Sequence, residues 1–243
     1  MTLHEEIDAS ASDRAGVSHG AALGTVILLH GFAGLPIMSH PQARMLRRAG
    51  FRTRELGYDS WGKSLSQICE HLAPRVARVA ERSPGPIHFV GHSMGGLVIR
   101  ALLSDWRPRS MGHVVMLGTP NAGSEVADFV DSFPVLRPIL GKAAPALVTQ
   151  RSDAVEDLLG PVDYSLGIIA GDWQVPTPTL SRLIPGPNDG KVSVASTRLA
   201  ASADHIILPL SHVLMLYHRN AHREVRHFLR HGRFSPGARR DLG

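Results

Sequence analysis

Cysteine is almost absent from this sequence, because Cys69 is the only one among its 243 residues. A lone cysteine excludes an intrachain disulfide and argues against a cysteine-based metal site, so we expect Cys69 to be a small core residue. No run approaches the roughly 18 consecutive apolar residues of a membrane-spanning helix. Residues 1–20 are polar and acidic, without the basic and apolar regions of a secretory signal. We therefore expect a cytoplasmic protein without stable membrane insertion.

Acidic side chains are fewer than basic ones, 21 against 26, which gives a formal net charge of +5. The basic residues are spread along the chain except for arginines near the C-terminus, which are Arg219, Arg223, Arg226, Arg230, Arg233, Arg239 and Arg240. These arginines either contact anionic lipid or nucleic acid or, as we prefer, line the solvated face of a helix with a frayed tail. No nucleic-acid-binding motif lies beside them, so we expect no nucleic-acid partner.

Short apolar runs alternate with helical segments along most of the chain, in which 43% of the residues are hydrophobic. Such runs are typical of strands buried on both faces of a parallel sheet. We expect strands at 25–29, 51–58, 87–90, 113–117, 165–170 and 205–208. We expect the main helices at 41–49, 63–82, 94–104 and 214–231. The alternation predicts an α/β fold with a mostly parallel central sheet and helices on both faces.

The domain organisation follows from where this alternation starts and stops. Residues 1–22 are typical of a flexible arm, 23–232 of one α/β domain, and 233–243 of a basic tail. Within the domain, residues 131–162 carry four prolines and several apolar side chains, and this segment is too long for a simple crossover helix. We expect it to be a small cap over the pocket, the alternative being an ordinary irregular connection.

The pentapeptide Gly91-His92-Ser93-Met94-Gly95 has the pattern G-x-S-x-G and lies between an apolar run and a helical one. Strand, sharp turn and helix in this order form a nucleophile elbow, in which a strained serine projects its hydroxyl above the strand ends. The flanking glycines leave room for so tight a turn. We predict that Ser93 is a nucleophile, the alternative being a glycine-rich turn with a surface serine.

A serine nucleophile needs a base within hydrogen-bond reach and an acid that orients the base. In this fold both follow late strands, in the order serine, acid, histidine. Asp172 and Asp189 both follow the fifth predicted strand. We prefer Asp189 because its tight Asn-Asp-Gly turn presents the carboxylate rigidly. The alternative is that this motif is only a turn without a catalytic role. For the base we choose His212, which follows the last strand, whereas His205 begins it at the far end of the sheet.

The developing oxyanion of an acyl-transfer reaction needs two backbone N–H donors. We expect one from Met94, at the N-terminus of the helix after the nucleophile, where the helix dipole helps. We expect the other from Phe32, in the loop after the first strand, where Gly31 allows a close approach. His222 and Glu224 do not form a metal-ligand pattern, so we expect no metal and no cofactor.

Five segments in the same order resemble the α/β-hydrolase superfamily, and more narrowly its bacterial lipase/esterase branch. They are residues 28–34, 91–96, 118–124, 188–192 and 211–212. The Gly-Thr-Pro of the third segment, followed by Gly-Ser, is a further mark of the triacylglycerol-lipase-like members. The resemblance covers about residues 24–231. It implies Ser93 as nucleophile, Asp189 as orienting acid, His212 as base, and Phe32 and Met94 as oxyanion donors. The chain departs from the secreted lipases of this branch because it lacks a signal peptide and a disulfide pair.

Together these observations predict a serine carboxyl-ester hydrolase, of esterase or lipase type, that works through an acyl-enzyme. The apolar composition of residues 131–162 favours an apolar ester as substrate, either a small molecule or a lipid, and leaves peripheral membrane contact open. Two alternatives remain: acyl transfer or thioester hydrolysis by the same triad, and a non-catalytic protein that binds a lipid or a partner through the cap. The sequence does not indicate an oligomeric state.

Overall fold

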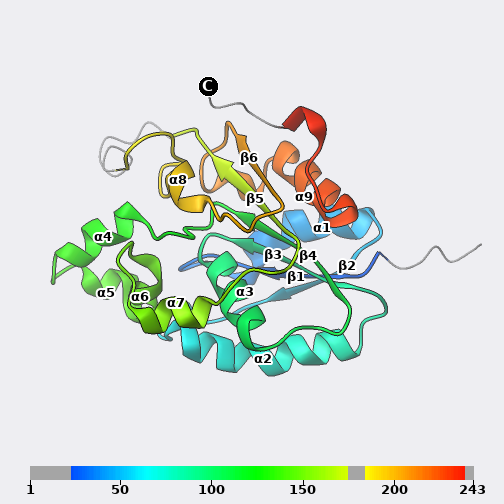
Figure 1. The fold of residues 1–243 in the computed structure, drawn as a ribbon, viewed down its shortest axis with the longest axis horizontal. Coiled ribbons are helices and arrows are strands. Elements are labelled where there is room, and N and C mark those ends of the chain that lie inside the picture. Colours follow the sequence, from blue (N-terminus) through cyan, green and yellow to red (C-terminus); the bar gives the residue numbers. More distant parts are fainter. Residues whose placement is uncertain (1–22, 175–183, 239–243) are drawn as a thin grey trace, which may run out of the picture.

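Six parallel strands form the centre of the molecule (Figure 1). The computed structural model describes residues 23–174 and 184–238. The strands are β1 (Thr25–Leu29), β2 (Arg52–Leu56), β3 (Ile87–His92), β4 (Met111–Leu117), β5 (Leu166–Gly171) and β6 (Asp204–Leu208). Their order across the sheet is β2-β1-β3-β4-β5-β6, and every neighbouring pair is parallel. The predicted parallel α/β sheet is confirmed.

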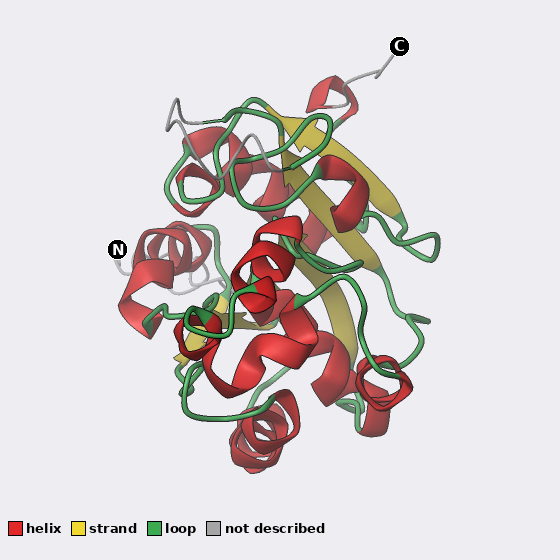
Figure 2. Ribbon diagram, turned by 90° about the vertical axis from the view of Figure 1, so that its left-hand side faces the viewer, coloured by secondary structure: helices red, strands yellow, loops and turns green. Residues whose placement is uncertain are grey.

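Helices cover both faces of this sheet, which explains why its central strands are largely apolar (Figure 2). The helices α2 (Leu65–Glu81) and α3 (Met94–Asp105) pack on one face, and α1 (His40–Arg48) and α9 (Arg219–His231) pack on the other. β1, β3 and β5 are buried along their whole length. A strand covered on both faces has no solvent side, so its sequence shows no polar alternation.

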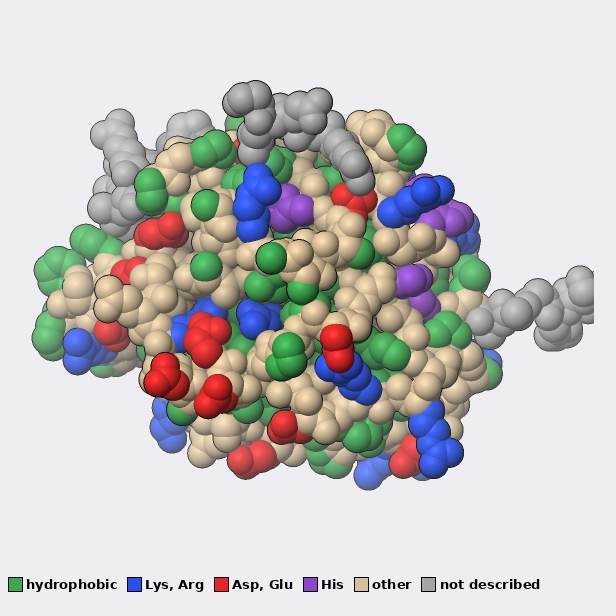
Figure 3. Space-filling view, viewed as in Figure 1, with side chains coloured by type: hydrophobic (Ala, Val, Ile, Leu, Met, Phe, Trp, Pro, Cys, Tyr) green, Lys and Arg blue, Asp and Glu red, His purple; other side chains and the backbone are tan. Residues whose placement is uncertain are grey.

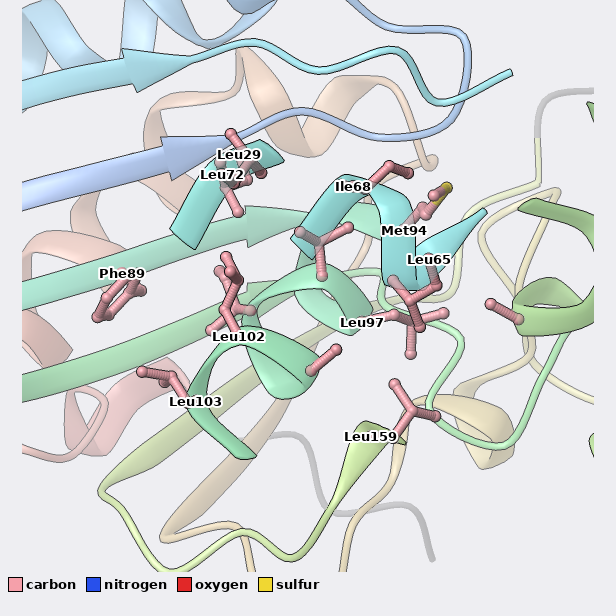
Figure 4. Close-up of a cluster of buried hydrophobic side chains, with 14 of the residues drawn as sticks. Leu29, Leu65, Ile68, Leu72, Phe89, Met94, Leu97, Leu102, Leu103 and Leu159 are labelled. Carbon is pink, nitrogen blue, oxygen red and sulfur yellow. The ribbon is translucent and has the colours of Figure 1, made fainter. Parts of the chain in front are cut away.

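Alternate residues of β1 belong to two separate hydrophobic cores. Ile27 and Leu29 pack in the core with α2 and α3, whereas Val26 and Leu28 pack in the core with α1 and α9. Figure 4 shows the first core, where Leu29 and Phe89 of the sheet lie among leucines of α2 and α3. Each such side chain contributes about 1.5–3 kcal/mol by its burial. The two cores therefore hold the carboxyl ends of the central strands in fixed positions.

The C-terminal helix is shorter than predicted. Instead of one helix over 214–231, the chain forms a 3₁₀ turn, Leu214–Leu216, and then α9. The break is at His218, whose backbone is extended (φ −77°, ψ 132°) and whose Nδ1 accepts a hydrogen bond from the Asn220 N–H at 3.2 Å. The prediction of one continuous helix is wrong because the side chain of His218 serves as an N-cap, a role for which serine, threonine, aspartate and asparagine are the usual residues.

After β4 the chain leaves the sheet and forms a series of short helices. They are α4 (Glu125–Ser132), α5 (Arg137–Leu140), α6 (Ala144–Leu147) and α7 (Asp153–Leu159), and one more, α8 (Val194–Thr197), lies between β5 and β6. The Trp61 Nε1 donates a hydrogen bond to the Pro138 carbonyl at 2.6 Å, and the Lys142 N–H donates to the Trp61 carbonyl at 2.8 Å. These bonds join α5 and the turn after it to the loop that follows β2. That the segment acts as a cap stays a prediction.

The predicted arm and the end of the predicted tail, residues 1–22 and 239–243, lie outside the described residues. The described part of the tail is packed against the domain. The Phe234 side chain is 3% exposed, and its backbone N–H donates to Asp204 Oδ2 at 3.0 Å. The buried Glu224 accepts from the Ser235 N–H at 2.9 Å. Among the described helices, none has the length and apolar character that crossing a bilayer requires. Cys69 is partly buried and packs against the first core.

Candidate active site

Ser93 occupies a strained turn between β3 and α3. Its backbone angles are φ 54° and ψ −128°, and Ala33 is the only other non-glycine residue with positive φ in the described part of the chain. Such a conformation costs about 1–3 kcal/mol and persists only where the surroundings enforce it. A Cβ on Gly91 would lie 2.6 Å from the Gly96 nitrogen, and one on Gly95 would lie 2.6 Å from the His30 carbonyl oxygen. The turn therefore requires glycine on both sides of the serine.

Hydrogen bonds to the backbone of Ser93 hold this turn. Its N–H donates to the Leu117 carbonyl at 2.8 Å, at the carboxyl end of β4. Its carbonyl accepts from the Gly96 N–H at 3.0 Å and from the Thr119 hydroxyl at 2.9 Å. The Thr119 side chain is fully buried. Two strands and the loop after β4 thus fix the backbone of Ser93.

His212 and Asp189 form a buried pair in the loops after β6 and β5. His212 Nδ1 lies 2.7 Å from Asp189 Oδ2, and the two residues are 5% and 2% exposed. The second carboxylate oxygen, Oδ1, accepts from the backbone N–H groups of Lys191 at 3.0 Å and Val192 at 2.8 Å. The His212 N–H also donates to the Asp189 carbonyl at 2.9 Å. These bonds fix the carboxylate, and the carboxylate fixes the imidazole.

The pair lies at the same edge of the sheet as Ser93. A Cβ on Gly118, directly after β4, would lie 2.9 Å from Asp189 Oδ2 and 3.0 Å from His212 Nδ1. His92, which precedes Ser93, places its Nε2 2.9 Å from the His212 carbonyl oxygen. Within the described residues the structure contains no hydrogen bond between the Ser93 hydroxyl and His212. Hydrogen bonds of this kind are often long in unliganded enzymes and tighten when substrate binds.

The residues expected to donate to the oxyanion lie on either side of Ser93. Met94 is the first residue of the twelve-residue helix α3. Phe32 lies in the loop after β1, and a Cβ on the neighbouring Gly31 would come within 2.9 Å of Ser93 Cβ. The two segments therefore meet at Ser93, which is the arrangement that an oxyanion hole beside this residue would need.

Tyr58 and Ser60, which the sequence did not single out, hold the loop after β1. The rings of His30 and Tyr58 stack at 4.3 Å between centroids, and the Tyr58 hydroxyl donates to the His30 carbonyl. His30 Nδ1 lies 2.8 Å from the Gly31 carbonyl, and its Nε2 accepts from the Tyr58 N–H at 3.3 Å. The Ala33 N–H donates to the Ser60 hydroxyl at 2.8 Å. Tyr58 and Ser60 follow the carboxyl end of β2, and this position in the sequence could have identified them as residues near the site.

The other candidates from the sequence lie elsewhere. Asp172 follows β5 directly, and its backbone N–H donates to the Leu208 carbonyl at 3.1 Å, while the imidazole of His212 pairs with Asp189. His205 lies in the first half of β6, with its Nε2 2.9 Å from the Thr197 hydroxyl oxygen, and burial lowers the pKa of its imidazole to about 4. Across residues 23–174 and 184–238 no group of three or more His, Cys, Asp and Glu side chains is placed to hold a metal ion.

Comparisons with known proteins establish the fold. No family model and no curated protein matches the chain by sequence. Among solved structures, the mature lipase BlEst2 of Bacillus licheniformis superposes with a TM-score of 0.68 at 19% identity, over 85% of this chain and 91% of that one. The metagenomic carboxyl esterase MGS0156 gives 0.58 at 16% identity, over 79% of this chain and 65% of that one. An extracellular α/β-hydrolase from a Paenibacillus species gives 0.52 at 13% identity, over 89% and 99%. The chain has the α/β-hydrolase fold.

Proposed function

We propose that the protein is a serine carboxyl-ester hydrolase in which Ser93 is the nucleophile, His212 the base and Asp189 the orienting acid. The observation that carries this proposal is the buried His212–Asp189 pair at 2.7 Å, at the same edge of the sheet as the strained Ser93 turn. A neutral imidazole that donates through Nδ1 to a carboxylate carries its lone pair on Nε2, where a serine proton is accepted. The lipases and esterases among the structures with this fold agree with the proposal.

In the proposed reaction the Ser93 oxygen attacks the acyl carbonyl while His212 Nε2 takes the hydroxyl proton. Collapse of the tetrahedral intermediate breaks the ester C–O bond, and His212 returns its proton to the departing alcohol. Water then attacks the acyl-enzyme with His212 again as base, which releases the acid and restores Ser93. The Asp189 carboxylate stabilises the imidazolium that forms.

The backbone N–H groups of Met94 and Phe32 are the donors that we propose for the oxyanion. The N–H of Met94 belongs to the first turn of α3, where backbone donors are unpaired and the helix dipole favours negative charge. The loop that carries Phe32 is braced by the stacked His30 and Tyr58 rings. A donor that is already fixed before the reaction stabilises developing charge without reorganisation.

The exposed apolar side chains support an apolar ester as the substrate. All but one of the large hydrophobic side chains exposed in the described residues lie between a strand and the next long helix, or among the short helices after β4. They are Leu35, Ile37, Trp61, Phe129, Phe133, Val135, Ile139, Trp173, Val213, Leu214 and Tyr217, the exception being Trp106. Figure 3 shows apolar side chains at the surface over α4 and α5. Exposed apolar side chains in the segments that follow the strands, where the candidate site also lies, favour an apolar ligand.

The proposal is tested with Ser93→Ala and Ser66→Ala, the second of which changes an exposed serine on α2. We expect Ser93→Ala to reduce the turnover of p-nitrophenyl esters by at least about 10³-fold, given the size of such effects in serine triads. Ser66→Ala should keep the wild-type rate. A fluorophosphonate probe should label the wild-type protein at Ser93, which peptide mass spectrometry identifies. A Ser93→Ala variant with wild-type turnover would show that the mechanism is wrong.

A further inference from the structure

His92 is a buried histidine beside the candidate nucleophile that the proposed mechanism leaves without a role. It is the last residue of β3, and 8% of it is exposed. Its ring lies 4.8 Å from the ring of His212, measured between centroids, at an angle of 53°. Its Nε2 is 2.9 Å from the carbonyl oxygen of His212. The contact joins the residue before the nucleophile to the residue that would act as base.

The direction of this hydrogen bond follows from its acceptor. A backbone carbonyl can only accept, so the proton must lie on Nε2 of His92 and the lone pair on Nδ1. Nδ1 faces the loop after β1, because a Cβ on Gly31 would lie 3.2 Å from it. Burial first, and the nearby His212 second, lower the pKa of the His92 imidazole to about 3. At neutral pH the ring is therefore an uncharged donor of fixed direction.

We propose that His92 is a positioning residue, which holds the base by donating from Nε2 to the carbonyl of His212. The inference rests on the proposed function. Three bonds then fix His212: its N–H to the Asp189 carbonyl, its Nδ1 to the Asp189 carboxylate, and its carbonyl to His92. Two of them come from Asp189, on the loop after β5. Only the third ties His212 to β3, the strand that ends at Ser93.

A neutral donor suits this position because His212 gains a positive charge during the proposed reaction. The charged groups that act on His92 are Asp189, which attracts a proton to it, and Lys191 and His212, which oppose one. A protonated His92 would repel the imidazolium of His212 across the ring contact and slow the step that forms it. The uncharged Nε2–H group holds the carbonyl of His212 without this electrostatic repulsion.

The test compares two substitutions of His92 with a matched control on the same strand. His92→Phe keeps a planar ring without a donor, and His92→Gln places an amide N–H close to the position of Nε2. The control is His88→Phe, which removes another buried imidazole of β3 whose Nε2 lies 3.1 Å from the Leu23 carbonyl, at the opposite end of the strand. We expect His92→Phe to lower kcat on a p-nitrophenyl ester about 10–100-fold with KM within threefold of wild type, since small misplacements of catalytic groups have effects of this size. His92→Gln should recover most of that loss, and His88→Phe should keep the wild-type kcat.

Hydrogen–deuterium exchange supplies a readout that does not depend on ester hydrolysis. In His92→Phe the amides of residues 210–217 should exchange faster than in wild type, whereas in His92→Gln and His88→Phe they should not. A His92→Phe variant with wild-type kcat and exchange overturns the proposal, as does a His92→Gln variant that is as slow as His92→Phe. If Ser93→Ala keeps the wild-type rate, the proposed function fails, and the exchange rates alone then decide whether His92 holds the His212 loop.

Discussion

Replacing Asp189 with asparagine should disable the base without disturbing the fold around it. Asp189 Oδ1 accepts two backbone N–H groups, at 3.0 and 2.8 Å, and Oδ2 faces His212 Nδ1. In Asp189→Asn the amide oxygen should keep the two backbone donors, because the opposite orientation would set the amide N–H groups against both of them. The amide nitrogen then faces His212 and donates to Nδ1. The imidazole must carry its own proton on Nε2, where it can no longer accept one from Ser93.

The size of the effect follows from this change of tautomer. In serine triads the same exchange reduces kcat by about 10⁴-fold while the geometry stays intact, which corresponds to about 5 kcal/mol of transition-state stabilisation. The assay is kcat and KM for p-nitrophenyl butyrate from pH 5 to 10. The free energy of unfolding in urea is measured alongside, and we expect a loss of about 1–3 kcal/mol from the weakened buried hydrogen bond.

Asp172→Asn is the matched control, because Asp172 also follows β5 and its sequence position made it the alternative acid. We expect this variant to keep kcat within about threefold of wild type, as a substitution that leaves the His212–Asp189 bond in place should. If Asp189→Asn hydrolyses the ester within tenfold of wild type while it remains folded, Asp189 does not orient the base. If Asp172→Asn shows the 10⁴-fold loss instead, the two aspartates have been assigned the wrong way round.

Two further predictions concern the backbone after β4 and the buried histidines. Gly118→Ala should lower kcat at least about tenfold, because its Cβ at φ 55° would meet Asp189 Oδ2 at 2.9 Å and His212 Nδ1 at 3.0 Å. Gly186→Ala, at φ 72° with no described neighbouring atom within 4 Å of its Cβ, should lose stability but keep kcat. Equal kcat values in the two variants would refute this prediction. Acid should unfold the protein: burial lowers the pKa values of His88, His92 and His205 to about 4, 3 and 4, so as pH falls below 6.5 the unfolded chain binds protons first. Each of these three histidines then lowers the free energy of unfolding by on the order of 2–3 kcal/mol at pH 4. Urea unfolding at pH 7, 5.5 and 4 measures this loss, and an unchanged free energy of unfolding contradicts the prediction.

The sheet was predictable from the sequence because its strands lie between two layers of helices. A strand buried on both faces is largely apolar, so the predicted strand at 25–29 coincides with β1, and the others differ from the structure by a few residues at their ends. The C-terminal helix was less predictable, since its start depends on the His218 side chain as cap. Local periodicity determines whether a helix forms, whereas single hydrogen bonds determine where it begins.

The candidate site was predictable only as far as chain topology reaches. In a parallel sheet the carboxyl ends of all strands meet at one edge, so residues that follow β3, β5 and β6 were expected to lie together, and His212 does pair with Asp189. The contacts of His92 with the His212 carbonyl and of Tyr58 with His30 were not predictable. These contacts depend on the position of each loop relative to the edge of the sheet. Tertiary packing determines that position, and the local sequence does not encode it.

The strain at Ser93 and the restraint of His212 have the same structural source. The Leu117 carbonyl at the end of β4 accepts the Ser93 N–H, and the next residue, Gly118, lies against the His212–Asp189 pair. A shift of β4 along its axis would therefore relax the Ser93 turn and loosen His212 together. Two hydrophobic cores prevent such a shift. One packs β3 and β4 against α2 and α3, and the other packs them against α1 and α9. The rigid sheet thus supplies the preorganisation that the proposed reaction requires, and the loops need only carry the reacting groups to its edge.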